Sequence, residues 1–169
     1  RILFAAGGNI FRRARSYHKI MEHMLPRLDL LVTTDFRMSN TALHSDYVLP
    51  AAGYYERDDI AWGHGTAPYS TAATEAVKPI GDYKTDWAIH CLIVKKIQER
   101  AVARGIGTFI DRHGGERRLD RVYDDFTFGG RYTEDNPEDL LTDIMEINDN
   151  LDGMSWQELK AAGHKRFSG

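Results

Sequence analysis

The sequence predicts an α/β fold: a partial doubly wound, Rossmann-like parallel sheet with flanking helices and a long irregular insertion. Three short apolar runs favour this class, at Arg1–Ala6, Leu28–Thr33 and Asp46–Pro50. The first two enclose a helical pattern with short connections, for which a right-handed parallel strand–helix–strand unit is the natural solution. A sheet of three strands has poorly covered edges. We therefore expect the other strands to lie elsewhere in a longer chain.

The first half of the sequence alternates between strand and helix patterns. Gly7-Gly8-Asn9 closes the first strand as a tight turn. Residues 11–25 place apolar side chains three and four positions apart, which predicts one amphipathic helix ended by Pro26. After the second strand, residues 39–45 predict a helical turn capped by Ser39.

The second half is less regular. Residues 51–84, rich in glycine and containing Pro68 and Pro79, predict a long and mostly irregular excursion. Residues 85–103 are the strongest helical pattern, with Thr85 or Asp86 as the N-cap and Gly105 as the stop.

Residues 112–136 are dense in charge and glycine and predict an insertion loop. Short helices are predicted at 137–148 and 155–162, the second with a Ser155–Glu158 capping box. The functional division we predict is a nucleotide-binding half-domain at 1–104, an insertion region at 105–150 and a segment leading to a further domain at 151–169.

Composition excludes several classes of function. The chain has 169 residues, 42% hydrophobic and 28% charged, with a net charge of −3, so no basic field for nucleic acid is expected. No apolar run approaches the roughly 20 residues of a membrane span. Cys91 is the single cysteine, which excludes an iron–sulfur cluster held by this chain alone, and it is interpreted as a buried structural thiol. The histidines lack metal-ligand spacing; they are His18, His23, His44, His64, His90, His113 and His164.

Candidate binding residues follow the first two strands. The turn at Gly7, Gly8 and Asn9 lets a backbone approach a ligand, and a helix N-terminus there would offer N–H groups to an anion; a plain connecting turn is the alternative. Thr34 and Asp35 end the second strand, where ligands dock in open α/β sheets. A carboxylate there can accept two hydrogen bonds from a ribose or from a guanine edge. The alternative is an aspartate that caps the turn at residues 38–41.

Two charged residues farther along are weaker candidates. Arg57, in the sequence Glu-Arg-Asp-Asp, can meet a phosphate or stack on a base, or belong to a solvated charge cluster. Asp86 begins the strongest helix, and capping alone also explains it. No nucleophile–base arrangement and no metal-ligand set is evident, so we assign no catalytic and no metal-binding residue.

Several of these segments together resemble the molybdopterin oxidoreductase superfamily. They are residues 30–50 (LLVTTDFRMSNTALHSDYVLP), 55–57 (YER) and 84–87 (KTDW). The sequences of these segments are most similar to the type II dimethyl sulfoxide reductase group. This group includes nitrate, selenate, chlorate and perchlorate reductases, dimethylsulfide dehydrogenase and ethylbenzene-type hydroxylases. The resemblance covers residues 1–104 and touches residues 155–160 (SWQELK).

The resemblance implies a role for each candidate. Catalytic subunits of this family bind two molybdopterin guanine dinucleotides (bis-MGD) with molybdenum, and a region like this one lines one nucleotide. Asn9 would contact the cofactor, and Thr34 with Asp35 would take the guanine edge. Arg57 would lie at the base or phosphate rim, and Asp86 would add a polar contact. The molybdenum ligand and the iron–sulfur cluster belong to other parts of the family's chains.

The leading hypothesis is therefore a fragment of a molybdenum oxidoreductase that transfers oxygen or hydroxylates a substrate, and the isolated fragment is expected to be inactive. Its expected partners are the rest of the catalytic subunit and an iron–sulfur electron-transfer subunit, without nucleic acid or direct membrane insertion. The subgroup implies a periplasmic location, with a cytoplasmic, membrane-associated location as the alternative. A non-catalytic guanine-nucleotide-binding or assembly module, or an inert remnant, remains the alternative function.

Overall fold

The structure is a computed structural model that describes residues 1–62 and 67–168. It separates into two compact units. The first unit is Arg1–Gly53 with Lys78–Asp86, and the second is Tyr54–Val77 with Trp87–Gly169. His64 lies outside the described residues, and the functional division at residues 104 and 150 stays a prediction.

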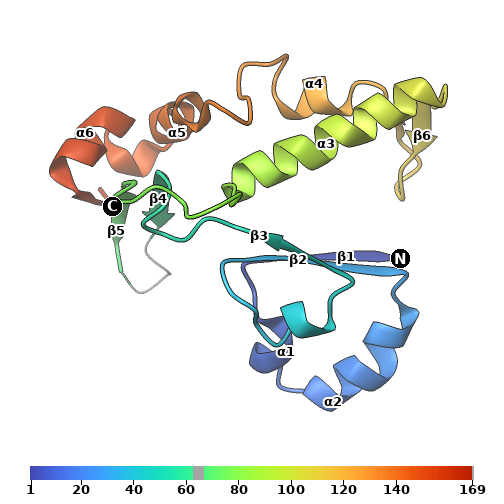
Figure 1. The fold of residues 1–169 in the computed structure, drawn as a ribbon. Helices are drawn as coiled ribbons and strands as arrows, with labels where there is room; N and C mark the ends of the chain where they lie inside the picture. Colours follow the sequence, from blue (N-terminus) through green and yellow to red (C-terminus); the bar gives the residue numbers. More distant parts are fainter. Residues whose placement is uncertain (63–66, 169) are drawn as a thin grey trace. The chain divides into compact units, whose positions relative to one another are not determined.

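A three-stranded parallel sheet forms the centre of the first unit (Figure 1). Its strands lie in the order β1 (Ile2–Ala6), β2 (Leu30–Asp35) and β3 (Tyr47–Pro50). The central strand β2 is buried from its second residue onward, as expected for a strand paired on both sides. Ala6 pairs with Thr34, and Asp35 pairs with Pro50. The predicted α/β class and its three strands are confirmed.

The connection from β1 to β2 differs from the prediction. Instead of one helix over residues 11–25, it consists of four short segments: α1 (Ile10–Arg13), α2 (Tyr17–Lys19), the π-helix η1 (Ile20–Met24) and the 3-10 helix η2 (Leu25–Arg27). The break comes at Ala14, whose ψ of 132° is extended. Phe11 explains the short α1, because this side chain is 1% exposed and its amide donates to the Thr41 hydroxyl at 3.2 Å. Pro26 falls in the first turn of η2, where its missing N–H costs little.

The connection from β2 to β3 carries the predicted helical turn, η3 (Ala42–His44). The Ser39 hydroxyl accepts a hydrogen bond from the Ala42 amide at 3.3 Å, so this residue caps the turn as predicted. The Ser45 hydroxyl lies 2.6 Å from the Thr33 hydroxyl and donates to the Thr41 carbonyl at 2.9 Å. These bonds fasten the connection to the sheet.

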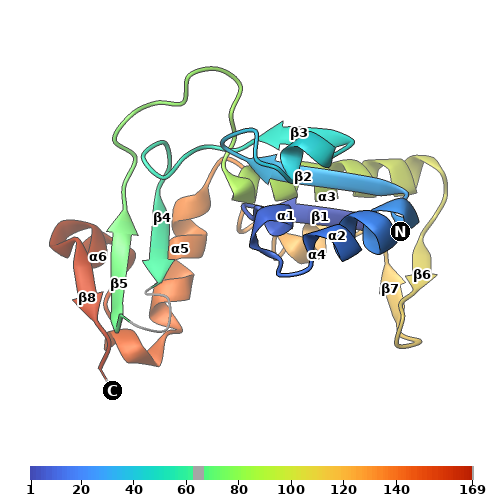
Figure 2. The same ribbon diagram turned by 90° about the horizontal axis from the view of Figure 1, so that it is seen from below.

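The second unit contains an antiparallel sheet in the order β4 (Asp59–Trp62), β5 (Tyr69–Ala73) and β8 (His164–Arg166) (Figure 2). Most of the described residues in 51–84 are irregular, as predicted, but the segment also contains the strands β4 and β5, which the prediction did not include. Their short sheet is completed by β8 from the end of the chain, which no local pattern reveals. The helices that pack near it are α5 (Pro137–Glu146), η4 (Asp149–Leu151) and α6 (Trp156–Ala162). The core is made of Ile60, Leu141, Met145, Leu151, Trp156 and Leu159.

The long helix α3 (Asp86–Ala103) confirms the strongest predicted helix, and Gly105 ends it with a positive φ of 65°. The predicted insertion loop after it is partly ordered. A hairpin of β6 (Thr108–Ile110) and β7 (Glu116–Arg118) leads to the short helix α4 (Val122–Phe126). The predicted capping box of α6 is present, with Ser155 and Glu158 bonded reciprocally.

A polar network fastens residues 123–134 to α3. Trp87 donates from Nε1 to the Thr133 carbonyl at 2.9 Å. The Glu134 carboxylate takes a 2.5 Å bond from Lys95 and another from the Tyr123 hydroxyl, and these two bonds lower its pKa to about 2. Cys91 is fully buried, and desolvation, with the nearby Glu134 charge, raises its thiol pKa to about 11. The prediction of a buried structural thiol is confirmed.

Among the described residues, none of the helices has the length and apolar content that crossing a bilayer requires. Within the same part of the chain, no three potential ligands from histidine, cysteine, aspartate and glutamate gather into a metal site.

Candidate functional site

The ends of the three parallel strands form one continuous edge in the first unit. The Gly7 amide, just after β1, donates to the Thr34 carbonyl at 2.9 Å, and the Ala51 amide, just after β3, donates to the Asp35 carbonyl at 3.1 Å. Lys84 extends this edge, because it forms a parallel bridge with Ala51 and its backbone carbonyl accepts a hydrogen bond from the Ala52 amide at 2.9 Å. The carboxyl ends of parallel strands are the usual ligand edge of open α/β sheets.

Thr34 and Asp35 lie at the centre of this edge with unused bonding capacity. Asp35 is 7% exposed, and no described residue donates a hydrogen bond to its carboxylate. The Thr34 hydroxyl oxygen is buried and has no hydrogen-bond partner within the described chain. Because buried polar groups are nearly always hydrogen-bonded in native proteins, this pair fits a donor that comes from outside these residues. The alternative role for Asp35, capping the turn at residues 38–41, is not supported, since Ser39 performs it.

Asn9 is held beside this edge through Thr41. Its side chain does not cap α1; its Oδ1 accepts from the Thr41 hydroxyl at 3.4 Å instead. No described residue accepts from the Asn9 Nδ2 group, so its two N–H donors remain available. Thr41 is fully buried, and its hydroxyl also accepts a hydrogen bond from the Phe11 amide. Thr41 is a positioning residue that the site prediction omitted, although the Thr-Ala pair six residues after Asp35 was its signal in the sequence.

The turn after β1 gives access rather than charge. Gly7 has a φ of +61°, and a Cβ placed there would meet no atom within 4 Å, so the backbone is open to a ligand at this point. The expectation of free N–H groups at a helix N-terminus is wrong for the first turn of α1. The Ile10 amide donates to the Gly8 carbonyl at 2.9 Å, and the Arg12 and Arg13 amides donate to the Asn9 carbonyl.

Asp86 and Arg57 occupy different units. Asp86 is the last residue of the first unit and the first residue of α3, two positions after Lys84. A negative charge at this position stabilises the N-terminus of the helix. Arg57 belongs to the second unit, pairs with Asp59 at 3.0 Å and lies 5.6 Å from the centre of the Tyr54 ring. Its side chain is 14% exposed, so the alternative of a solvated charge does not hold for Arg57. The structure brings together Asn9, Thr34 and Asp35.

Taken together, a parallel sheet with a glycine turn, an acceptor pair and an amide donor at its carboxyl edge is typical of α/β proteins that bind nucleotides. The chain belongs to the molybdopterin oxidoreductase family, whose model matches residues 1–96. This confirms the family indicated by the motifs at residues 30–50 and 84–87.

Relatives within the family are much longer than this chain. It is 41% identical over 125 residues to the respiratory nitrate reductase subunit alpha of Haloferax mediterranei, covering 73% of this chain and 13% of that protein. It is 33% identical over 165 residues to the chlorate reductase subunit alpha of Ideonella dechloratans, covering 96% of this chain and 18% of that protein. The fold is similar to that of acetylene hydratase from Pelobacter acetylenicus, with a TM-score of 0.59 at 20% identity over 99% of this chain and 18% of that chain.

Proposed function

We propose that this chain is part of the catalytic subunit of a molybdenum oxidoreductase and contributes part of the site for one molybdopterin guanine dinucleotide. Family membership and relatives named as alpha subunits of nitrate and chlorate reductases support the class of enzyme. The observation that carries the site is the buried Asp35 carboxylate, which has no donor among the described residues, at the strand end where the Thr34 hydroxyl is also unsatisfied.

The polar groups at this edge fit a guanine nucleotide. Guanine presents N1–H and N2–H₂ side by side, and the two oxygens of the Asp35 carboxylate accept both in parallel. The Thr34 hydroxyl supplies one further donor or acceptor at the same edge. The amide of Asn9 donates to a phosphate or to the pterin, and the open backbone at Gly7 leaves room for either.

In this proposal the residues of the chain hold the nucleotide and exclude water from its base. When bound, the cofactor supplies the two-electron chemistry of molybdenum, and the parent enzyme transfers an oxygen atom or hydroxylates its substrate. Asp86 adds a polar contact near the Lys84 end of the edge. A contact of Arg57 with the base or a phosphate stays a prediction from the resemblance, because Arg57 belongs to the second unit. The edge has its main binding groups on three neighbouring segments of one unit, which supports a preorganised site.

The partners in this proposal are the rest of the catalytic subunit and an iron–sulfur electron-transfer subunit, with any iron–sulfur cluster held outside this chain. The alpha-subunit names of the relatives support an assembly of several chains. The periplasmic location stays a prediction from the resemblance.

The test is the replacement of Asp35 by alanine and by asparagine in the full-length subunit, followed by measurement of GMP released on acid hydrolysis and of molybdenum per subunit. A charge-assisted hydrogen bond contributes about 1.5–3 kcal/mol, so losing two should reduce cofactor retention by about tenfold or more. Asp29→Asn is the matched control, because this exposed aspartate precedes the same strand at its opposite end. An unchanged GMP content in both Asp35 variants would contradict the assignment.

A further inference from the structure

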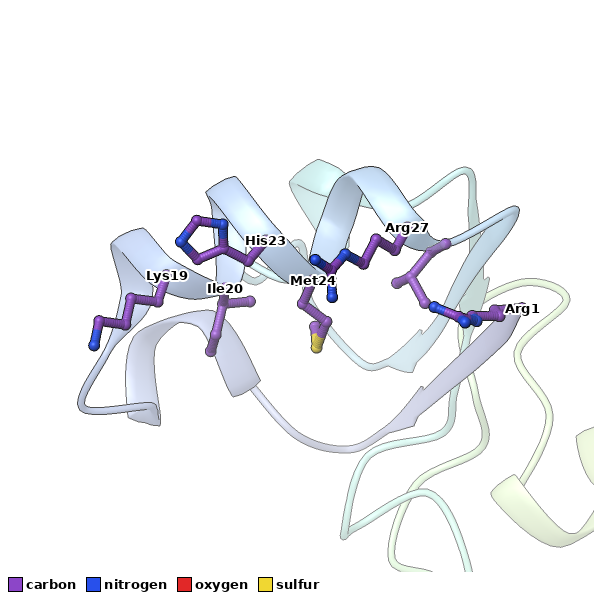
Figure 3. Close-up of a pocket in the computed structure, with 7 residues that line it drawn as sticks. Arg1, Lys19, Ile20, His23, Met24 and Arg27 are labelled. Atoms are coloured by element: carbon purple, nitrogen blue, oxygen red, sulfur yellow. The ribbon is translucent and has the colours of Figure 1, made fainter.

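The segment between β1 and β2 has an apolar row that the described residues leave uncovered. Although α2, η1 and η2 together carry the apolar side chains of an amphipathic helix, none of their residues is buried. A pocket of about 420 Å³ lies along this segment (Figure 3). It is lined by Arg1, Lys19, Ile20, His23, Met24, Arg27 and Leu28, and we call it the basic groove. Arg1 and Leu28 come before β1 and β2, so the groove lies at the amino ends of these strands, away from the candidate site.

Two parallel rows of side chains define the basic groove. Ile20, Met24 and Leu28 form an apolar row with four-residue spacing, and all three are half-buried. Ile20 and Met24 belong to the helical segment, and Figure 3 shows them directed to the same side of it. Leu28 follows the segment as its extended C-cap and lines the same pocket. Lys19, His23 and Arg27 repeat the spacing one position earlier and form an exposed cationic row beside the first.

The positive charge of this segment is poorly neutralised. Residues 1–27 carry six lysines and arginines against one acidic residue, Glu22, although the whole chain has a net charge of −3. Glu22 lies 4.0 Å from His23. Neither Lys19 nor Arg27 makes an ion pair with any residue in the described ranges. An apolar floor beside unpaired cations is complementary to an acidic surface that also presents apolar side chains.

We propose that the basic groove binds an acidic amphipathic helix of a partner protein. Apolar side chains of that helix at i, i+4 and i+8 cover Ile20, Met24 and Leu28, and its glutamates or aspartates pair with Lys19 and Arg27. The rows span residues 19–28, so about three turns of the partner helix are in contact.

A concave groove fits a helix better than it fits a membrane surface. Helices that lie on a bilayer insert protruding apolar side chains into it. Here the apolar row forms the half-buried floor of the groove, and none of Ile20, Met24 and Leu28 is exposed. The basic groove lies at the amino ends of the strands, whereas the proposed cofactor site lies at their carboxyl ends. Binding of a partner in the basic groove is therefore independent of the cofactor site.

The experiment uses the full-length subunit and a fluorescein-labelled synthetic 15-residue helix with leucine at every fourth position and glutamate beside each leucine. Binding is followed by fluorescence anisotropy. We expect Lys19→Glu combined with Arg27→Glu to raise the Kd about tenfold or more, because attraction becomes repulsion. Arg13→Glu combined with Arg15→Glu is the matched control, since it makes the same charge change in the same segment outside the groove, and its effect should stay within about threefold.

Met24→Asp tests the apolar row separately and should also weaken binding about tenfold. GMP content should be unchanged in all these variants, which separates this test from that of the cofactor site. The proposal is overturned if the acidic helix does not bind, or if both double variants weaken binding equally. It is also overturned if phosphatidylglycerol vesicles bind with the same dependence on Lys19 and Arg27 and the peptide does not.

Discussion

Glu134→Gln should destabilise the second unit through the loss of one charge. The Glu134 side chain is 12% exposed, and its bonds from Lys95 and Tyr123 hold its pKa at about 2 instead of 4.5. At about 1.4 kcal/mol per pH unit, that difference corresponds to at most about 3–4 kcal/mol. Lys95 is 44% exposed, so solvent screening reduces the contribution to about 1–2 kcal/mol. Glutamine keeps the volume and an acceptor for Tyr123 but removes the ion pair.

The assay is urea unfolding of the 169-residue chain followed by tryptophan fluorescence. All three tryptophans, Trp62, Trp87 and Trp156, belong to the second unit, so the signal reports on that unit alone. The control is Glu99→Gln, which removes an exposed pair with Lys96 and should cost less than about 0.5 kcal/mol.

The pH dependence gives the sign of the effect. Because the folded-state pKa of Glu134 is lowered, its stabilisation is fully present above the unfolded-state value of 4.5 and is lost as the pH falls towards about 2. The difference between wild type and Glu134→Gln should be constant near neutral pH and shrink below about 4.5. An unchanged unfolding midpoint at neutral pH, or a difference that persists undiminished in acid, would show that the Glu134 charge does not stabilise the second unit.

Three further predictions concern the same unit. Cys91 should react with a thiol reagent only after unfolding, because it is fully buried and its pKa is raised to about 11; rapid labelling of the folded chain would contradict this. Ser155→Ala should lower the free energy of unfolding by about 1 kcal/mol in the urea assay, because it removes the cap of α6, and an unchanged midpoint would disprove it. Leu159→Ala should cost about 2–5 kcal/mol because it opens a cavity beside Trp156, and a loss below about 1 kcal/mol would show that this core is loosely packed.

Elements with a local signature were predicted from the sequence. The strands β1 to β3 are short apolar runs between turn residues, and α3 and α6 have recognisable ends at Gly105 and Ser155. The antiparallel sheet was not predicted, because β4 and β5 are completed by β8 far along the chain and their own residues show no clear alternation. The break near Ala14 was missed because burial of Phe11, a tertiary effect, overrides helical periodicity.

The candidate site was predicted where its residues lie at strand ends. Asp35 follows from the position of a carboxylate after a buried strand, and the structure adds that Thr34 beside it is unsatisfied. Thr41 was not assigned, because its role depends on a hydroxyl that reaches Asn9 and Phe11 from a distant part of the sequence. Arg57 has an ion-pair partner two residues away, which the sequence shows only as a cluster of charges.

The contacts of the Asp35 carboxylate in the full-length, cofactor-loaded subunit decide whether this carboxylate binds the guanine. An experimental structure of that protein should place the two carboxylate oxygens within about 3.2 Å of the guanine N1 and N2 atoms, with the Thr34 hydroxyl bonded to the same nucleotide. The assignment of the guanine to Asp35 is contradicted if both Asp35 and Thr34 are instead satisfied by protein groups from the rest of the subunit while the guanine binds elsewhere.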